Sequence, residues 1–141
     1  MTESEKINLS KALDELTALT DDLQKRWTDY LELEYENGKY LNERSYFDDM
    51  AMIADYIAEK LKQNDTENFM LLFETLENIY IKYDLTTCSI ISAGLLESIQ
   101  AHKTIDYHFG FNKWLKPATL KWWEGGIDYW EGTSWRERNG C

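Results

Sequence analysis

The chain has 141 residues, 43% of them hydrophobic and 14% aromatic, and its formal net charge at pH 7 is −11. This length suits a single domain with a sizeable core, and the apolar content excludes a disordered chain. The negative charge argues against nucleic acid or an anionic membrane as a partner, because their phosphates would be repelled, and it favours a basic protein.

Two helices are predicted at the N-terminus. The first covers residues 9–19, where leucine recurs at helical spacing. Thr20 then has the position of an N-cap, and Asp21 and Asp22 follow in the first turn of the second helix, where the helix dipole favours carboxylates. Gly38 is the expected end of this second helix. Its outward side is acidic and carries Asp22, Asp29, Glu32 and Glu36.

A third helix should begin at Ser45, because Asp48 follows three residues later in a pattern like a capping box. Its predicted core stripe is Phe47, Met50, Ile53, Ala54, Ile57 and Leu61. Its opposite side presents Asp48, Met52, Asp55, Tyr56 and Glu59. Two large apolar side chains among carboxylates suit an anchor for a partner protein, although isolated apolar residues on a surface are also common.

Residues 66–102 are the most apolar part of the chain and predict two helices, capped by Thr66 and joined by a turn at Tyr83 and Asp84. In the second of them, one face consists of Cys88, Ile91, Ser92, Leu95 and Ile99. The opposite face is also apolar and consists of Ile90, Ala93, Gly94 and Ala101. A helix that is apolar on two sides belongs between other elements, so we expect the rest of the chain to pack around this pair.

The C-terminal part predicts one further helix after a turn or short helix at residues 103–112. Pro117 suits the first turn of this last helix. Its predicted inward stripe is Leu120, Trp123, Ile127 and Trp130. Gly125 and Gly126 either weaken the helix midway or let another backbone approach closely. Residues 1–8 and 134–141 are polar and are expected to be frayed.

These elements predict an all-α fold in which residues 1–141 form one compact helical domain, compatible with a short HEAT-like stack of antiparallel helices. No convincing strand pattern is present. The longest apolar run, residues 69–73, is too short to cross a membrane, and the first residues lack the features of a signal peptide, so we expect a cytoplasmic protein. Cys88 and Cys141 should both be free thiols.

Glu77 and Glu97 are the most unusual polar residues, because both lie on or beside apolar helix faces. We expect them to be structural and to accept hydrogen bonds from a helix N-terminus, a tyrosine hydroxyl or an indole N–H. The alternative is an enzyme that uses both glutamates and one histidine in an interior pocket. His102 and His108 fit no familiar metal-binding spacing, so the sequence predicts no catalytic residue, metal or cofactor.

Residues 73–77 and 91–100 resemble a family of small all-helical bacterial immunity proteins, which belong to contact-dependent growth inhibition and other toxin–immunity systems. Glu77, Gly94 and Glu97 carry the resemblance most specifically. Pro117 and the tryptophans after it are similar to the closing segment of that family. The match covers residues 66–130, whereas the N-terminal helices match only in their aromatic spacing.

The resemblance implies a protein without enzymatic activity that binds one cognate toxin domain in a 1:1 complex and blocks its active site. Many such toxins are nucleases with basic clefts, and an RNase is the expected type. The charge fits this partner, because residues 1–59 hold 15 acidic and 6 basic residues, a net charge of −9. The acidic and apolar side chains of the second and third helices are therefore the predicted contact surface. A general helical adaptor without a toxin partner, and an acidic mimic of nucleic acid, stay open as alternatives.

Overall fold

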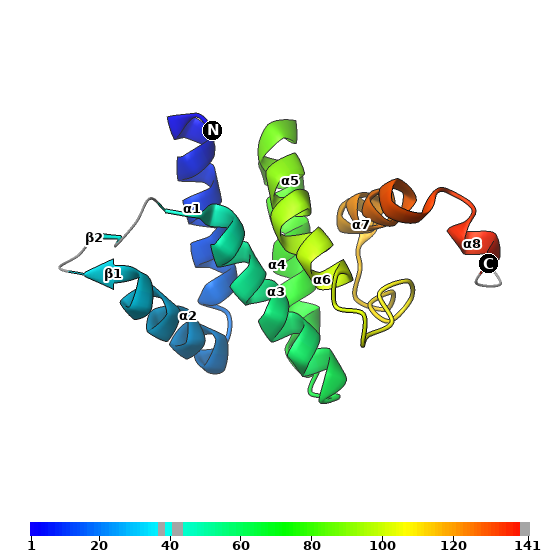
Figure 1. Ribbon diagram of the computed structural model, residues 1–141, viewed down its shortest axis with the longest axis horizontal. Coiled ribbons are helices and arrows are strands. Elements are labelled where there is room, and N and C mark those ends of the chain that lie inside the picture. The colour runs from blue at the N-terminus through cyan, green and yellow to red at the C-terminus, as the bar shows by residue number, and fades with distance from the viewer. Residues whose placement is uncertain (37–38, 41–43, 139–141) are drawn as a thin grey trace.

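A computed structural model describes residues 1–36, 39–40 and 44–138 of the chain (Figure 1). α1 (Glu3–Thr17) begins earlier than predicted, because Thr2 and Glu5 form a capping box in which each side chain accepts the backbone N–H of the other. The prediction that residues 1–8 are frayed is therefore wrong from Glu3 onward. α2 (Asp21–Glu34) begins as predicted, since Thr20 Oγ1 accepts the N–H of Leu23 at 3.2 Å.

A short β hairpin follows α2. β1 (Tyr35–Glu36) and β2 (Lys39–Tyr40) pair antiparallel, with Tyr35 opposite Tyr40. Strands of two residues are too short for an alternating pattern, which is why the sequence did not reveal them. α2 therefore ends at Glu34, and Gly38, its predicted end, lies outside the described residues.

The middle of the chain contains the long helices α3 (Tyr46–Lys62) and α4 (Phe69–Lys82). Ser45 caps α3 as predicted, since its Oγ accepts the N–H of Asp48 at 3.2 Å. The prediction that Thr66 caps the next helix is wrong, because Asn68 is the N-cap of α4 and Thr66 contributes only a carbonyl to the turn before it. Phe47, predicted as core, is 49% exposed, because it lies in the first turn of α3 at the edge of the helix contact.

The predicted turn at Tyr83 leads into α5 (Leu85–Ile91), η1 (Ser92–Leu96) and α6 (Glu97–Gln100), which form one continuous rod with a π-helical turn in its middle. The first predicted face of this rod is buried as expected, and Cys88 is a buried free thiol. The second predicted face is only partly buried, since Gly94 is covered but Ala93 and Ala101 are exposed. The wider π turn shifts the residues that follow it away from the regular helical spacing on which the prediction relied.

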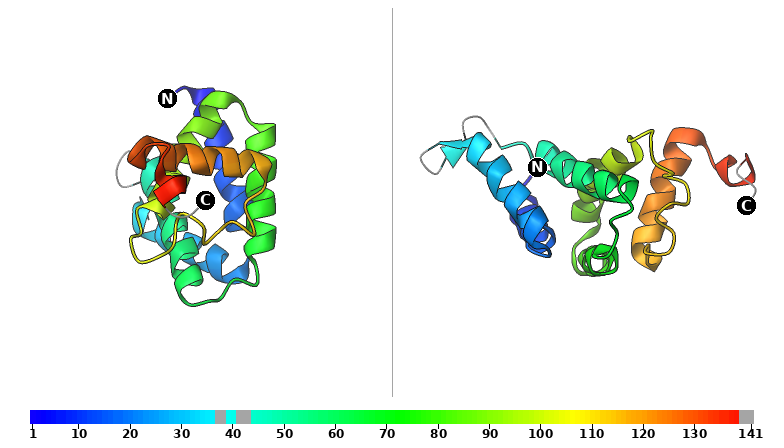
Figure 2. Two further views of the ribbon diagram at one scale, coloured as in Figure 1. Left: turned by 90° about the vertical axis from the view of Figure 1, so that its right-hand side faces the viewer. Right: turned by 90° about the horizontal axis from the view of Figure 1, so that it is seen from below.

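The helices follow one another along the longest axis of the molecule, from α1 and α2 at one end to α7 and α8 at the other (Figures 1 and 2). α4 and the rod from α5 to α6 lie between α1 and α3 on one side and α7 on the other. This arrangement confirms the all-α fold and the central position of the helical pair.

α7 (Pro117–Glu131) begins at Pro117 as predicted, and α8 (Trp135–Arg138) follows it. α7 is anchored through an aromatic cluster that Phe69 and Phe73 form with rings of the C-terminal part, namely Phe111, Trp114 and Trp123. Trp135 is 1% exposed, so the prediction that residues 134–141 are frayed is wrong for α8, while residues 139–141, including Cys141, lie outside the described residues. Within the described part of the chain, no helix has the length and apolar character that crossing a bilayer requires.

Candidate functional site

α2 and α3, which carry the predicted contact surface, pack side by side through polar contacts. The guanidinium of Arg26 lies 2.7 Å from Glu59, and the ammonium of Lys60 lies 2.7 Å from Asp22. The hydroxyl of Tyr56 donates to Asp22 at 2.8 Å. These contacts place the acidic sides of the two helices next to each other.

Three residues of the predicted surface, Asp22, Tyr56 and Glu59, hold this junction together and do not face solvent as free groups. Tyr56 is 3% exposed, so its predicted place among exposed anchors is wrong. The guanidinium of Arg26 lies over its ring, 5.4 Å from the centroid, and its hydroxyl contacts Thr20 and Asp22. Burial opposes ionisation of Asp22, but hydrogen bonds from Lys60, Thr20 and Tyr56 outweigh it and hold the pKa of this carboxyl well below its usual range. Glu59 is likewise paired, with Arg26.

The remaining carboxylates form what we call the α2–α3 acidic surface, which consists of the exposed side chains Asp29, Glu32, Asp48 and Asp55. Asp29 pairs with Lys25 of its own helix at 3.1 Å, and Asp55 lies 2.8 Å from His102. Glu32 and Asp48 have no ion-pair or hydrogen-bond partner for their carboxylates among the described residues. Met52 is half-buried beside them, and the side chain of Glu36 lies outside the described residues.

Glu77 has the structural role that the sequence predicts. It is 7% exposed, and its carboxylate accepts the backbone N–H groups of Ala118 and Thr119 at 3.0 and 2.8 Å. The hydroxyl of Thr119 donates to it as well, at 2.8 Å. Glu77 of α4 thus caps the first turn of α7, where the positive end of the helix dipole favours an anion.

The same prediction is wrong for Glu97. No hydrogen-bond donor or cation within the described residues contacts its carboxylate, and burial raises its pKa. The π turn directly before it brings Glu97 to the boundary between α6 and α7, where it lines two hollows. Helical turns of the π type are frequent at functional sites, and the sequence offers no simple signal for them.

The groups of the enzyme alternative are not brought together. Glu77 contacts residues 118 and 119 at the start of α7, whereas the hollows around Glu97 border residues 122–130 further along that helix. His102 faces Asp55, and His108 lies 2.7 Å from Glu131. In the described ranges, no group of three or more His, Cys, Asp or Glu side chains could hold a metal ion.

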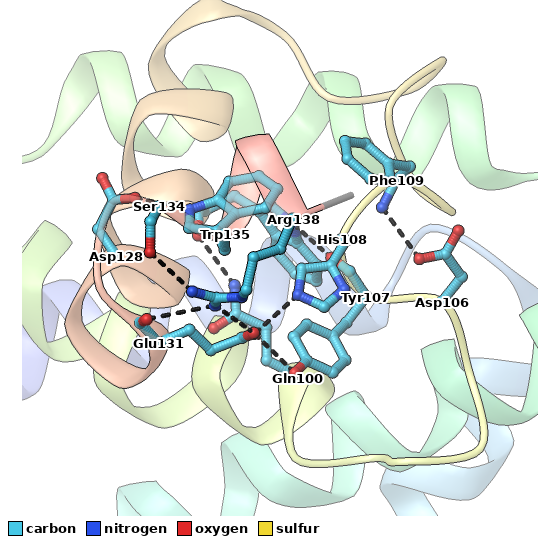
Figure 3. A network of polar contacts seen from close by, with 11 residues as sticks. Gln100, Asp106, Tyr107, His108, Phe109, Asp128, Glu131, Ser134, Trp135 and Arg138 are labelled. Atoms are coloured by element: carbon cyan, nitrogen blue, oxygen red, sulfur yellow. Dashed lines mark hydrogen bonds and ion pairs between the residues drawn. The ribbon is translucent and has the colours of Figure 1, made fainter. Parts of the chain in front are cut away.

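The C-terminal end is held by a polar network around Glu131 (Figure 3). Its carboxylate accepts the hydroxyl of Tyr107 at 2.7 Å and contacts His108 at the same distance. Burial opposes the charge of Glu131, but these two contacts outweigh it and lower its pKa. Close by, Gln100 donates to the carbonyl of Trp123 at 2.9 Å, so the network and this bond fix α7 against the turn and α6.

Two aromatic residues that the sequence did not single out as surface residues stand on the part of α7 that this network fixes. Tyr129 is 78% exposed and Trp130 is 63% exposed, although Trp130 belongs to the predicted inward stripe. The signal that could have found them is the pair of glycines at 125 and 126, which interrupts the apolar stripe just before them.

Comparison with known proteins places the chain by family. No curated protein and no solved structure matches it. A family model described as "Domain of unknown function (DUF7674)" matches residues 11–131. This range runs from within α1 to the last residue of α7, and it includes both the α2–α3 acidic surface and the hollows around Glu97. The chain therefore belongs to the DUF7674 family.

Proposed function

We propose that the chain is an immunity protein, which binds a basic toxin domain in a 1:1 complex in the cytoplasm and blocks its active site. The observation that best supports this proposal is the α2–α3 acidic surface, where Glu32 and Asp48 have no partner in the described part of the chain. Unpaired, exposed carboxylates on adjacent helices suit a partner that supplies cations. A nuclease, and in particular an RNase, fits because its cleft must be basic to hold phosphates.

Inhibition in this proposal is steric and is aided by charge. The carboxylates attract the basic cleft over a distance and then pair with the lysine and arginine side chains that would otherwise hold the phosphates. Asp22, Tyr56 and Glu59 contribute by fixing α2 against α3, so that the surface is rigid before the partner arrives.

The first test is co-purification with the protein domain that is encoded immediately upstream, followed by a nuclease assay at increasing ratios of this chain to that domain. We expect a stable complex and loss of cleavage at the equimolar point. If the upstream domain cleaves no nucleic acid and forms no complex with this chain, the proposal is wrong.

Neutralising the acidic surface should weaken this inhibition. We expect the triple variant Asp29→Asn, Glu32→Gln, Asp48→Asn to associate with the toxin domain about tenfold more slowly, because steering by charge accelerates association by that factor or more. The matched control changes Glu67, Glu74 and Glu137 to Gln, which alters the total charge equally at exposed positions elsewhere. Equal slowing in the two variants, measured by stopped-flow fluorescence, would place the interface elsewhere.

A general helical adaptor is the second candidate. It is favoured by apolar side chains that stand in solvent on α4 and at the start of α5, where Met70 and Ile81 are each 69% exposed and Leu85 is 74% exposed. A partner bound there would be held by apolar contacts, and its affinity would change little with salt. Strong weakening by salt would instead support the acidic surface.

A further inference from the structure

The rod of η1 and α6 packs against α7, on the side of the molecule away from α2 (Figure 1). Residues of both line a groove. Its walls enclose two hollows of about 320 and about 400 Å³, and Glu97 lines both of them. Hollows of this size are large enough to take a side chain or a small ligand. Glu97 is the residue that the linings of the two hollows share.

Glu97 lacks the hydrogen bonds that offset the cost of burying the charge of other carboxylates in the protein. Glu77 and Glu131 each accept several hydrogen bonds, which outweigh the effect of burial on their charge. Glu97 accepts none from the described residues, and Lys103, which borders the same hollow, makes no ion pair with it. A partly buried anion without a donor is unfavourable, so a cationic group that entered the groove would be stabilised by Glu97 and would stabilise its charge in turn.

The groove also has aromatic walls. Trp122 and Tyr129 border one hollow. Tyr107 and Trp130 border the other. Gly125 borders the first hollow as well. It has no side chain to fill the space there, and a Cβ atom at this position would have no neighbour within 4 Å. Large aromatic rings that stand partly in water around a charged group are typical of the residues that dominate binding energy at interfaces.

We propose that this groove binds an arginine side chain of a basic partner protein. A guanidinium group is planar, donates two parallel hydrogen bonds to one carboxylate, and is weakly hydrated enough to stack on aromatic rings. Glu97 accepts the two hydrogen bonds, and the hollows offer the group rings to stack on, Trp122 in one and Trp130 in the other. A lysine ammonium is a strongly hydrated point charge and gains less from such walls.

The groove is separate from the α2–α3 acidic surface, so this inference and the proposed immunity function succeed or fail independently. An NMR titration of the full chain with L-argininamide tests the inference, with L-lysinamide at the same ionic strength in parallel. We expect argininamide to shift the carboxyl resonance of Glu97 and the indole resonances of Trp122 and Trp130 in a saturable way. Lysinamide should bind clearly more weakly.

Two variants locate the effect. Glu97→Gln should weaken argininamide binding about tenfold, as expected for the loss of a hydrogen-bonded charge pair. Trp130→Ala removes an exposed ring without disturbing the core and should weaken it as well. The matched control Glu32→Gln removes one carboxylate from α2 and should leave the titration unchanged. The inference is overturned if argininamide leaves the Glu97 resonance in place, if lysinamide binds equally well, or if Glu32→Gln has the same effect as Glu97→Gln.

Discussion

Glu77 and Glu97 both belong to the central helical pair, yet the pKa values of their carboxyl groups shift in opposite directions. The desolvation that opposes ionisation of Glu77 is outweighed by the N–H groups of Ala118 and Thr119, so its pKa is lowered. Glu97 has no such donors within the described residues, and its pKa is raised. The environment of each carboxylate, and not its residue type, decides whether its charge stabilises the fold.

Glu77→Gln should destabilise the protein by about 1–3 kcal/mol at pH 7, because an amide turns one acceptor into a donor against the N–H groups of α7. Since the pKa of Glu77 is lowered in the folded state, its stabilising effect is present above the usual value of 4.5 and is lost as the pH falls through the lowered pKa. Urea denaturation at several pH values measures this difference. Glu74→Gln, an exposed neighbour on α4, is the control and should change stability little.

Glu97→Gln should have the opposite effect and stabilise the protein at pH 7. The raised pKa means that the folded state holds the Glu97 proton more tightly than the unfolded chain does, so stability falls as the pH rises above the usual value of 4.5. The glutamine variant escapes this loss, and the two proteins should have the same Tm at a pH below that value. A variant that is less stable than the natural chain at pH 7 would show that Glu97 has a stabilising partner after all.

At the scale of elements, the contact between α6 and α7 depends on one of two adjacent glycines. A Cβ atom at Gly126 would lie 2.8 Å from Oε1 of Gln100, which is buried and bonded to Trp123 through its amide nitrogen. Gly125 faces open space. Only Gly126 therefore allows α7 to approach Gln100 of α6 closely.

Substituting the two glycines separately should therefore give opposite results. Gly126→Ala should cost about 1–3 kcal/mol, because Gln100 must move out of a packed site. Gly125→Ala should add about 0.5–1 kcal/mol, since alanine is the better helix former and nothing obstructs its methyl group. Thermal unfolding of both variants measures the difference. Equal changes in Tm would mean that α7 does not pack against Gln100 in this way.

The local elements of the fold could be predicted from the sequence, because their signals are local. Thr20 and Ser45 cap the helices that follow them, and Pro117 opens α7, each through a contact within one helical turn. The sequence could predict that Glu77 accepts hydrogen bonds from a helix N-terminus. It could not predict that this helix is α7, since the partner of Glu77 lies 41 residues away. The prediction for Tyr56 was wrong because the packing of α2 against α3 buries it. The prediction for Glu97 was wrong because the π turn before α6 changes its position.

At the scale of the whole molecule, charge is distributed unevenly along the longest axis. The acidic α1 and α2 lie at one end and the acidic α3 lies near the middle, whereas residues 85–141, which hold as many basic as acidic residues, reach the other end (Figure 1). This separation makes the protein an electric dipole that turns its acidic end toward a basic partner before contact.

The association rate with such a partner should consequently fall steeply as salt is added, while the dissociation rate changes little, because screening acts on the approach more than on the close contacts. Stopped-flow association between roughly 0.05 and 0.5 M NaCl, a range over which the Debye length falls below 10 Å, measures this dependence. A rate that is insensitive to salt would exclude steering by charge.

The π turn at Ser92–Leu96 also determines the position of Glu97 in the groove. A hydrogen bond that spans five residues in place of four accommodates one extra residue in the helix. If the same residues formed a regular α-helix, every side chain after this turn would lie about 100° away around the helix axis, and Glu97 would leave the groove. The π turn, and not the residue spacing alone, thus decides where this carboxylate lies.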